Sequence, residues 1–191
     1  MIIWINGSFG VGKTTAAKLL QRKLTKAHIY DPEQAGYFLW DNFPPELSRQ
    51  GDFQDMEIWR SVNYQVIRYL HDNYDGDLIL PMTLANRAYY DEIIGRLEQD
   101  GILVRHFILT APKERIVSRL RVRGDEPGCW AEQQVERCLA AFGNDIPGIT
   151  VDADGVDAEA VVDFILKEIV HKIYAPLRKG SWQPNGLTEG S

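Results

Sequence analysis

The sequence has few of the residues that mark metal, redox or membrane proteins. It contains two cysteines, Cys129 and Cys138, whose spacing fits neither a metal site nor a redox pair, and four histidines that share no spacing. No apolar run approaches the length of about 20 residues that a membrane-spanning helix needs. These absences argue against a metal site of histidine or cysteine, a nucleophilic triad and a transmembrane protein. They favour buried, reduced thiols in a cytoplasmic protein.

The chain also lacks an excess of basic residues. Its formal net charge is −6, which disfavours nucleic acid or an anionic membrane surface as the main partner. Apolar residues make up 45% and charged residues 25% of the 191 positions, an ordinary composition for a globular protein of one domain. We expect that domain at residues 1–175. A mobile tail is expected at 176–191, where Pro, Gly, Ser and Asn follow no apolar period.

What the sequence does contain is a glycine-rich octet at residues 7–14. It reads Gly-Ser-Phe-Gly-Val-Gly-Lys-Thr and fits the phosphate-binding pattern G-x-x-x-x-G-K-[ST] of the P-loop. An apolar run, Met1–Ile5, precedes the octet and helix-forming residues, Thr15–Leu24, follow it, which is the order of strand, loop and helix that the motif needs. A chance glycine turn, the alternative, does not predict these flanks. Because the octet begins at residue 7, we expect no signal peptide before it.

The residue types of the octet suit phosphate binding. Glycines let the backbone turn its N–H groups inward, and the start of the following helix adds a positive potential. Lys13 can reach the β- and γ-phosphates as a point charge, and the Thr14 hydroxyl can ligate Mg²⁺. The sequence therefore predicts that ATP and Mg²⁺ bind here. The predicted nucleotide-binding residues of this region are Gly7, Ser8, Phe9, Gly10, Val11, Gly12, Lys13, Thr14 and Thr15.

Short apolar runs alternate with helical patterns along the rest of the chain, which indicates an α/β fold. Strands are expected at Ile2–Ile5, His28–Tyr30, Leu78–Leu80, Val104–Leu109 and Gly148–Val151. Further helices are expected at about Met56–Tyr74, Tyr89–Asp100, Lys113–Arg123, Ala131–Phe142 and Ala158–Ile173. The pattern predicts the doubly wound, five-stranded parallel sheet with flanking helices of P-loop NTPases. Ligands of such sheets bind at the carboxyl ends of the strands, so residues just after the strands become candidates.

Two acidic residues follow the second predicted strand, in Asp31-Pro32-Glu33. Asp31 can take the proton of an acceptor hydroxyl or hold Mg²⁺ through water, and Glu33 can hydrogen-bond the acceptor. The same pattern fits a helix start, with Asp31 as the N-cap and Pro32 at the first helical position. The two interpretations are compatible. Asp31 is therefore predicted as a catalytic, substrate-binding and metal-binding residue, and Glu33 as a substrate residue.

The third predicted strand ends without an acidic residue. Pro81-Met82-Thr83 follow it, where motor and switch NTPases place the aspartate that holds Mg²⁺ and water. This absence disfavours those classes and favours a small-molecule kinase. Thr83 is either a substrate contact or an ordinary residue between strand and loop.

Arginines supply the other half of the predicted site. Arg115, Arg119 and Arg123 step by four along the Lys113–Arg123 helix. Such a row can hold phosphates or stack on a base, and we expect Arg119 near the adenine and Arg123 at the phosphates. The alternative is a solvated basic face. The turn-rich segment at 124–128 predicts a kinase-like lid, and Arg137 on the next helix is expected to close on the phosphates.

One further arginine, Arg60, lies in the Met56–Tyr74 helix. The apolar residues of one face of this helix are Trp59, Val62, Val66 and Leu70. A position beside this face can put Arg60 at the substrate, whereas the ordinary alternative is a solvated arginine. Asp52-Phe53-Gln54 precede the helix, fit its capping segment and are expected to shape the acceptor pocket.

Segments far beyond the octet resemble the bacterial tunicamycin-resistance protein family and, more broadly, P-loop kinases of shikimate, gluconate and nucleosides. The resemblance implies an ATP-binding protein that protects against tunicamycin, a nucleoside antibiotic with sugars and a fatty acyl chain. Some members are suggested to reach the membrane through an amphipathic C-terminal segment, which the short segment after Ile173 does not predict here. The segments that carry the resemblance are Ile3–Gly7, the octet, Tyr30–Glu33, Asp52–Gln54, Trp59-Arg60, Pro81–Thr83, Glu92–Leu97, Arg119–Arg121 with Arg123, and Trp130-Ala131 with Gln134, Arg137 and Cys138.

The sequence thus predicts an ATP- and Mg²⁺-dependent kinase that phosphorylates a hydroxyl of a small nucleoside-like or sugar-like molecule. Its predicted catalytic residues are Lys13, Asp31, Arg123 and Arg137. One alternative is a protein that binds a nucleotide and sequesters the antibiotic without phosphoryl transfer. Another is a slow regulatory NTPase, which the missing acidic residue after the third strand disfavours.

Overall fold

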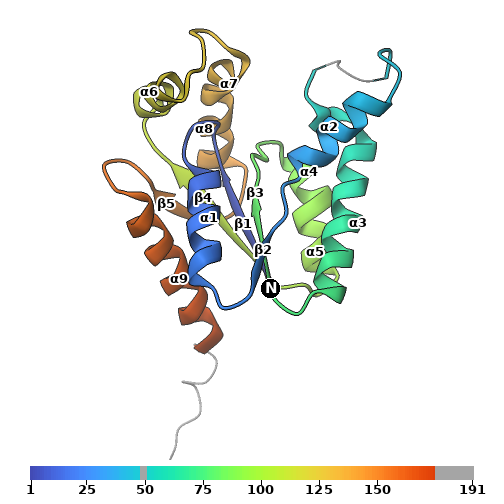
Figure 1. The fold of residues 1–191 in the computed structure, drawn as a ribbon, viewed down its shortest axis with the longest axis vertical. Coiled ribbons are helices and arrows are strands. Elements are labelled where there is room, and N and C mark those ends of the chain that lie inside the picture. The colour runs from blue at the N-terminus through green and yellow to red at the C-terminus, as the bar shows by residue number, and fades with distance from the viewer. Residues whose placement is uncertain (48–50, 175–191) are drawn as a thin grey trace, which may run out of the picture.

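The computed structural model describes residues 1–47 and 51–174, which form a parallel sheet with helices on both faces (Figure 1). The strand order is β2-β3-β1-β4-β5, and all four pairings are parallel. The strands are β1 (Ile2–Gly7), β2 (Ala27–Ile29), β3 (Asp77–Pro81), β4 (Val104–Thr110) and β5 (Ile149–Asp152). The predicted doubly wound, five-stranded α/β fold is confirmed. The predicted mobile tail, 176–191, lies outside the described residues.

Helices cover the two faces of the sheet (Figure 1). The α-helices are α1 (Lys13–Lys23), α2 (Glu33–Asn42), α3 (Glu57–Asn73), α4 (Arg87–Tyr90), α5 (Arg96–Gln99), α6 (Lys113–Arg123), α7 (Trp130–Gln133), α8 (Val135–Asn144) and α9 (Ala158–Tyr174). A 3₁₀ turn, η1 (Phe53–Asp55), precedes α3, and a π-helical turn, η2 (Asp91–Gly95), joins α4 to α5.

The central strand β1 is buried along its whole length, and its side chains alternate between two apolar cores. Ile2 and Trp4 belong to the core on the side of α3, α4 and α5. Ile3 and Ile5 belong to the core on the side of α1 and α9. A parallel strand covered on both faces has no solvent side, which explains why its sequence is an unbroken apolar run.

The buried face of α3 differs from the predicted one. Trp59 is buried as expected, but the other buried residues of this helix are Asn63, Tyr64 and Ile67, while Val62, Val66 and Leu70 are half-buried. Apolar periodicity missed Asn63 because this residue is polar. Its burial is possible since its amide donates to the Trp59 carbonyl at 2.9 Å and its oxygen accepts from the Tyr30 hydroxyl at 2.8 Å.

Two predicted helices have different boundaries in the structure. The helix expected at Tyr89–Asp100 begins at Arg87, because Asn86 caps it by accepting hydrogen bonds from Ala88 N and Tyr89 N. The helix expected at Ala131–Phe142 is divided at Gln134 into α7 and α8. The other predicted strands and helices agree with the structure to within two residues at each end.

A polar contact ties together the carboxyl ends of β1, β3 and β4. Asn6 accepts from Gly7 N at 2.8 Å and Leu84 N at 2.9 Å, and it donates to Leu84 O at 3.0 Å. Its amide also lies 3.1 Å from Nε2 of His106, whose Nδ1 lies 2.6 Å from the Pro147 carbonyl. A carbonyl only accepts, so Nδ1 carries the proton and Nε2 accepts from Asn6. Burial lowers the pKa of His106 to about 4, which keeps this ring neutral.

The predictions about thiols and membranes can be compared with the described residues. Cys129 and Cys138 are free, as expected, but only Cys138 is buried, whereas Cys129 is half-buried at the lid. Within residues 1–47 and 51–174, no helix combines the length and the apolar character that crossing a bilayer requires.

Candidate functional site

The glycine-rich octet turns from β1 into α1 at the carboxyl edge of the sheet. Gly7 has a φ of 139°, and a Cβ atom there would lie 2.6 Å from the Leu109 carbonyl oxygen. Gly10 has a φ of 80°, and a Cβ atom there would lie 2.8 Å from Leu120 of α6. Glycine is therefore required at these two positions for conformation and for close packing against β4 and α6.

Lys13 lies under the octet with its ammonium group turned toward the loop. Nζ donates to the carbonyls of Gly7 and Ser8, both at 3.0 Å, and lies 5.4 Å from the centroid of the Phe9 ring. Burial lowers the pKa of Lys13 to about 8, although Glu33 nearby acts in the opposite direction. The group is therefore a weakly hydrated cation at neutral pH, well suited to an incoming phosphate.

The octet forms one wall of a cavity of about 550 Å³, which we call the phosphate cavity. Its lining residues are Phe9, Gly10, Gly12, Lys13, Thr14, Thr15, Asp31, Glu33, Tyr37, Pro81, Arg119, Arg123, Trp130 and Ala131. The structure thus brings together the predicted P-loop residues, the acidic pair after β2 and two arginines of α6. These groups meet because β1 and β2 end at the carboxyl edge of the sheet, and α6 follows the end of β4 at the same edge.

Arg119 separates the phosphate cavity from a second, more apolar cavity of about 280 Å³ behind the loop, which we call the base cavity. Its guanidinium donates to the Val11 carbonyl at 2.9 Å and to the Ala153 carbonyl at 2.6 Å. Both cavities contain Arg119 in their linings, and Val156 also lines the base cavity. The position is compatible with the predicted one near a base, since two carbonyls hold the guanidinium beside the base cavity.

The other arginines of α6 do not form a single row over the phosphates. Arg115 pairs with Asp154 at 3.1 Å, and Arg121 pairs with Glu132 of α7. Arg123 lines the phosphate cavity, but its Nε and Nη2 contact the two oxygens of Asp125 at 2.5 and 2.9 Å. A bidentate carboxylate occupies the same donors that a phosphate would use.

The acidic pair after β2 serves the start of α2 as well as the cavity. Asp31 Oδ1 accepts from Glu33 N at 3.0 Å, and its Oδ2 lies 3.4 Å from the Gln34 amide. These contacts agree with the helix-start interpretation, although α2 begins at Glu33, one residue later than predicted, and Asp31 and Thr14 both line the phosphate cavity. Oxygen donors of this kind suit Mg²⁺, which takes few protein ligands when phosphates and water supply the rest. Among the described residues, no group of three or more His, Cys, Asp or Glu side chains could hold a metal alone.

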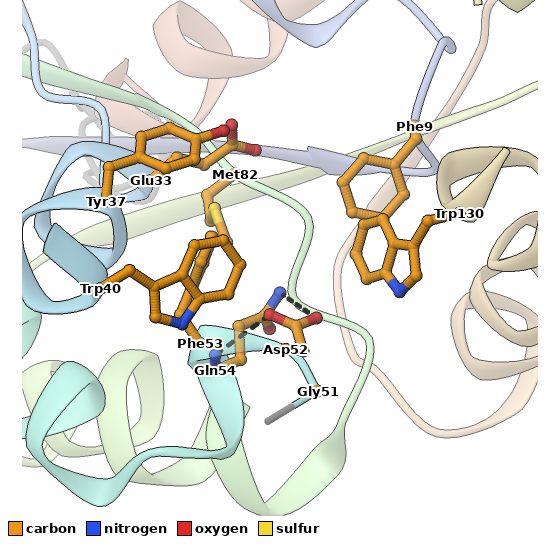
Figure 2. A pocket seen from close by; sticks show the side chains of 10 residues that line it. All are labelled: Phe9, Glu33, Tyr37, Trp40, Gly51, Asp52, Phe53, Gln54, Met82 and Trp130. Atoms are coloured by element: carbon orange, nitrogen blue, oxygen red, sulfur yellow. Dashed lines mark hydrogen bonds between the residues drawn. The ribbon is translucent and has the colours of Figure 1, made fainter. Parts of the chain in front are cut away.

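A third cavity, of about 310 Å³, opens beside the phosphate cavity, and half of its ten lining residues are aromatic (Figure 2). We call it the aromatic cavity. Tyr37 and Trp40 of α2 stand on one side of it, and Phe9 and Trp130 stand on the other (Figure 2). The full lining is Phe9, Glu33, Tyr37, Trp40, Gly51, Asp52, Phe53, Gln54, Met82 and Trp130. Its ring pairs are fixed by edge contacts, with centroids 5.1 Å apart for Trp40 and Phe53 and 4.9 Å apart for Phe9 and Trp130.

Four residues line the phosphate and the aromatic cavities at once: Phe9, Glu33, Tyr37 and Trp130. Glu33 is the acidic member of this boundary. Burial, followed by the charge of Asp31, raises its pKa, while Lys13 acts in the opposite direction. The same position raises the pKa of Tyr37, through burial and then the Glu33 carboxylate. A carboxyl group with a raised pKa thus stands where the contents of the two cavities would meet.

Five predicted site residues are absent from the linings of these three cavities, namely Gly7, Ser8, Arg60, Thr83 and Arg137. Thr83 is buried and donates from Oγ1 to the Gly7 carbonyl at 2.9 Å, so it supports the loop. Arg60 is directed into contacts with Glu92 and the Gln54 carbonyl. Arg137 is exposed on α8, near enough to Asp52 to act against the rise in its pKa that burial causes.

Comparison with known proteins agrees with this geometry. A family model described as an AAA domain matches residues 3–138. The chain belongs to this AAA-domain family. It is similar to the tunicamycin resistance protein of Deinococcus radiodurans, with 29% identity, a TM-score of 0.75, and coverage of 88% of this chain and 94% of that one. A search among curated protein sequences found no match.

Two small-molecule kinases share the fold of this AAA-domain protein at lower identity. A sugar kinase from a Janibacter species has 18% identity and a TM-score of 0.63, with coverage of 88% of this chain and 94% of that one. Shikimate kinase from Bacteroides thetaiotaomicron has 18% identity and a TM-score of 0.61, with coverage of 89% and 98%. The predicted resemblance to the tunicamycin-resistance family and the kinase-like P-loop fold are confirmed.

The aromatic walls of this AAA-domain protein were not predicted from the sequence. Tyr37, Trp40, Met82 and Trp130 are not among the predicted site residues, although Met82 and Trp130 lie in segments that carry the family resemblance and Asp52–Gln54 are expected at the acceptor pocket. One signal was present. Tyr37, Phe38 and Trp40 follow the acidic pair closely, and 44% and 63% exposure of the first two shows that they are not all core residues. Exposed aromatic residues beside a predicted site are typical of a ligand surface.

Proposed function

We propose that this protein is a kinase that transfers the γ-phosphoryl group of ATP to a hydroxyl of a small, nucleoside-like acceptor. The observation that carries the proposal is the shared boundary of the phosphate and aromatic cavities, which Phe9, Glu33, Tyr37 and Trp130 form. A donor phosphate on one side of this boundary and an acceptor on the other would be neighbours, as transfer between them requires.

The donor half consists of the octet and α6. Lys13 and the loop N–H groups hold the β- and γ-phosphates, and Arg119 lies against the base. Thr14 and Asp31 are the residues that would hold Mg²⁺, which neutralises charge on the phosphates when bound with ATP. Arg123 and Arg137 complete the phosphate contacts when the lid region closes, with Arg123 leaving Asp125.

The acceptor half is the aromatic cavity, and its lining supports a planar ring over a bare sugar. Trp40 and Phe53 on one side and Phe9 and Trp130 on the other offer apolar faces for stacking, a contact that any base can make. Gln54 adds an amide to the lining, with polar groups to orient such a ring. The Deinococcus radiodurans relative supports tunicamycin as a first acceptor to test.

Glu33 is the base in the proposed reaction. The acceptor oxygen attacks the γ-phosphorus, the new P–O bond forms as the bond to the ADP oxygen breaks, and the acceptor proton passes to the Glu33 carboxylate. Two observations favour Glu33 over Asp31 in this role. Glu33 lies at the boundary with a raised pKa, whereas Asp31 is absent from the lining of the aromatic cavity.

The test is transfer of radiolabel from γ-labelled ATP to tunicamycin, with Lys13→Ala as the matched variant. A labelled drug in the presence of wild type, and its loss by at least about 100-fold in Lys13→Ala, is the expected result. Drug-dependent protection against heat unfolding without a labelled product would replace the kinase by a sequestering protein. Release of inorganic phosphate at a rate independent of the drug would indicate an NTPase without an acceptor and would contradict the kinase proposal.

A further inference from the structure

Four side chains next to the aromatic cavity take no part in the proposed reaction. They are Arg60, Glu92, Tyr89 and Asp55, and we call them the Arg60 clamp. Arg60 Nε donates to Glu92 Oε2 at 2.6 Å, and the guanidinium carbon lies 4.3 Å from the centroid of the Tyr89 ring. The Tyr89 hydroxyl then donates to Asp55 Oδ1 at 2.8 Å. The Arg60 side chain is 11% exposed and that of Glu92 is 45% exposed, so the guanidinium is largely shielded while its acidic partner stays accessible to water.

The clamp is joined directly to one wall of the aromatic cavity. Arg60 Nη1 donates to the Gln54 carbonyl at 2.7 Å. Gln54 in turn donates from its backbone N and from its side chain to the two oxygens of Asp52, at 3.0 and 3.3 Å (Figure 2). Asp52, Phe53 and Gln54 all line the cavity. One guanidinium therefore holds the main chain of this wall, and the Tyr89 contact holds its far end at Asp55.

The geometry of Arg60 leaves it no role at the acceptor itself. Arg60 Nε and Nη1 donate to protein oxygens, and the Tyr89 ring lies against one face of the guanidinium plane. Arg60 lines neither the aromatic nor the phosphate cavity. A planar fork with donors in fixed directions can hold two oxygens and a ring at once, which a lysine cannot do. The partners Tyr89 and Glu92 come from α4 and the π-helical turn η2, whose Ile93 and Ile94 are fully buried and anchor the clamp.

We propose that Arg60 is a positioning residue, which fixes the Asp52–Gln54 wall of the aromatic cavity and does not touch the acceptor. The proposal rests on the proposed function only where it calls this cavity the acceptor site. It gives a joint role to three segments far apart in the sequence, Asp52–Gln54, Arg60 and Glu92. Side chains that hold a ligand-binding group in place commonly change affinity about tenfold or more when they are removed.

The first test is hydrogen exchange in the protein without ligands. Arg60→Met is compared with Arg60→Lys and with Arg68→Met, a matched control in the same helix whose arginine pairs with Asp72 and Asp100. In Arg60→Met, the amides of Gln54, Asp55 and Met56 should exchange about tenfold faster. Arg60→Lys should restore part of the protection, and Arg68→Met should leave these amides unchanged. Unchanged exchange in Arg60→Met overturns the proposal.

The second test separates acceptor binding from nucleotide binding, with tunicamycin and ATP as the ligands. Arg60→Met should raise the Kd for tunicamycin about tenfold and leave the Kd for ATP within about twofold. Loss of tunicamycin binding with unchanged exchange at Gln54–Met56 would mean direct contact and would overturn the proposal. If wild type does not bind tunicamycin, the exchange result still decides the role of Arg60, and only the proposed acceptor is refuted.

A variant that fails to fold does not block the comparison. Glu92→Ala removes a clamp partner whose side chain is 45% exposed, so it is expected to fold. It should speed the exchange of the same amides in the same direction as Arg60→Met, by a smaller factor. Identical exchange in Glu92→Ala and wild type would overturn the proposal independently of Arg60.

Discussion

Glu33 and Asp31 are separated by a single proline, yet their carboxylates have different surroundings. The Asp31 carboxylate is held at the start of α2 by Glu33 N and the Gln34 amide. Asp31 lines the phosphate cavity and does not line the aromatic cavity. Glu33 stands at the boundary of two cavities, where burial raises its pKa. Two neighbouring acids with different environments are a common way to divide metal binding and proton transfer between them.

The first residue-scale prediction concerns Glu33→Gln, which keeps the size of the side chain and removes its basicity. Transfer should fall by about 100-fold or more, whereas ATP and tunicamycin should still bind. The wild-type rate should rise with pH as Glu33 loses its proton, at a pH above the ordinary range of glutamate because the pKa is raised. Initial rates across pH check this, and the rise should be absent in Glu33→Gln.

Asp31→Asn is the contrasting variant for this prediction. It should shift the Mg²⁺ concentration needed for half-maximal rate and leave the pH profile in place. A pH profile that changes in Asp31→Asn and persists in Glu33→Gln would return the base role to Asp31, the residue that the sequence predicted for it.

Single residues of the donor half could be predicted from the sequence because a motif with fixed spacing specifies them. Lys13 and Thr14 follow from the octet, and both line the phosphate cavity. Arg60 and Thr83 were harder to interpret, since their roles depend on partners 32 and 76 positions away, Glu92 and Gly7. No local pattern encodes such contacts, so sequence reasoning left alternatives open at these positions.

At the scale of elements, the lid region from α6 to α7 is held by its own ion pairs. Arg121 pairs with Glu132, Arg123 with Asp125, and Lys113 of α6 with Glu136 of α8 at 2.5 Å. Of these cations, only Arg123 lines the phosphate cavity within the described residues. Its carboxylate partner therefore competes with the phosphates of a nucleotide.

This competition predicts that Asp125→Asn binds ATP about threefold more tightly than wild type, because Arg123 no longer has to leave a charged partner. Glu136→Gln is the matched control, since it frees Lys113, which lies outside the cavity linings. Calorimetric titration with a non-hydrolysable ATP analogue measures the effect. Equal or weaker binding by Asp125→Asn would show that Arg123 does not reach the phosphates.

Most helices and strands could be predicted from apolar periodicity and from the residues that start and stop helices. Their exact boundaries and buried faces depend on single polar side chains. Pro112 and Gly124 bracket α6 at the predicted residues. Because Asn63 is buried, the buried face of α3 differs from the predicted one. Because Asn86 caps α4, this helix begins two residues before the predicted start. A π-helical turn such as η2 has no sequence period of its own, so it could not be predicted.

For the whole molecule, the Asn6–His106 contact predicts a particular response to acid. Folding lowers the pKa of His106 from 6.5 to about 4, so between these values the unfolded chain binds more protons than the folded one. This contribution to stability is complete above pH 6.5 and is lost as the pH falls to about 4. The shift corresponds to about 3 kcal/mol of the free energy of unfolding.

Urea unfolding at several pH values tests this response. His106→Gln keeps a donor for the Pro147 carbonyl and an acceptor for Asn6, so this variant should lose about 3 kcal/mol less than wild type between pH 7 and pH 4. His71→Gln, on the surface of α3, should follow wild type. Parallel curves for His106→Gln and wild type would contradict the assignment.

The overall architecture was the part most accessible from sequence. A parallel sheet covered on both faces demands unbroken apolar strands, and the run at the start of the chain met that demand. The aromatic cavity was less accessible, because it is assembled from five places: the octet, α2, the segment from Gly51 into η1, Met82 after β3, and α7. Only the topology brings them together at one edge of the sheet.

Phe9 occupies one of the variable positions of the phosphate-binding motif. Its side chain lines the phosphate cavity and also the neighbouring aromatic cavity. In the proposed reaction, the loop that holds the donor phosphates would also form part of the acceptor site. A substitution at Phe9 would change the lining of both cavities at once. Under the proposed function, a change at Phe9 would therefore alter the binding of donor and acceptor together.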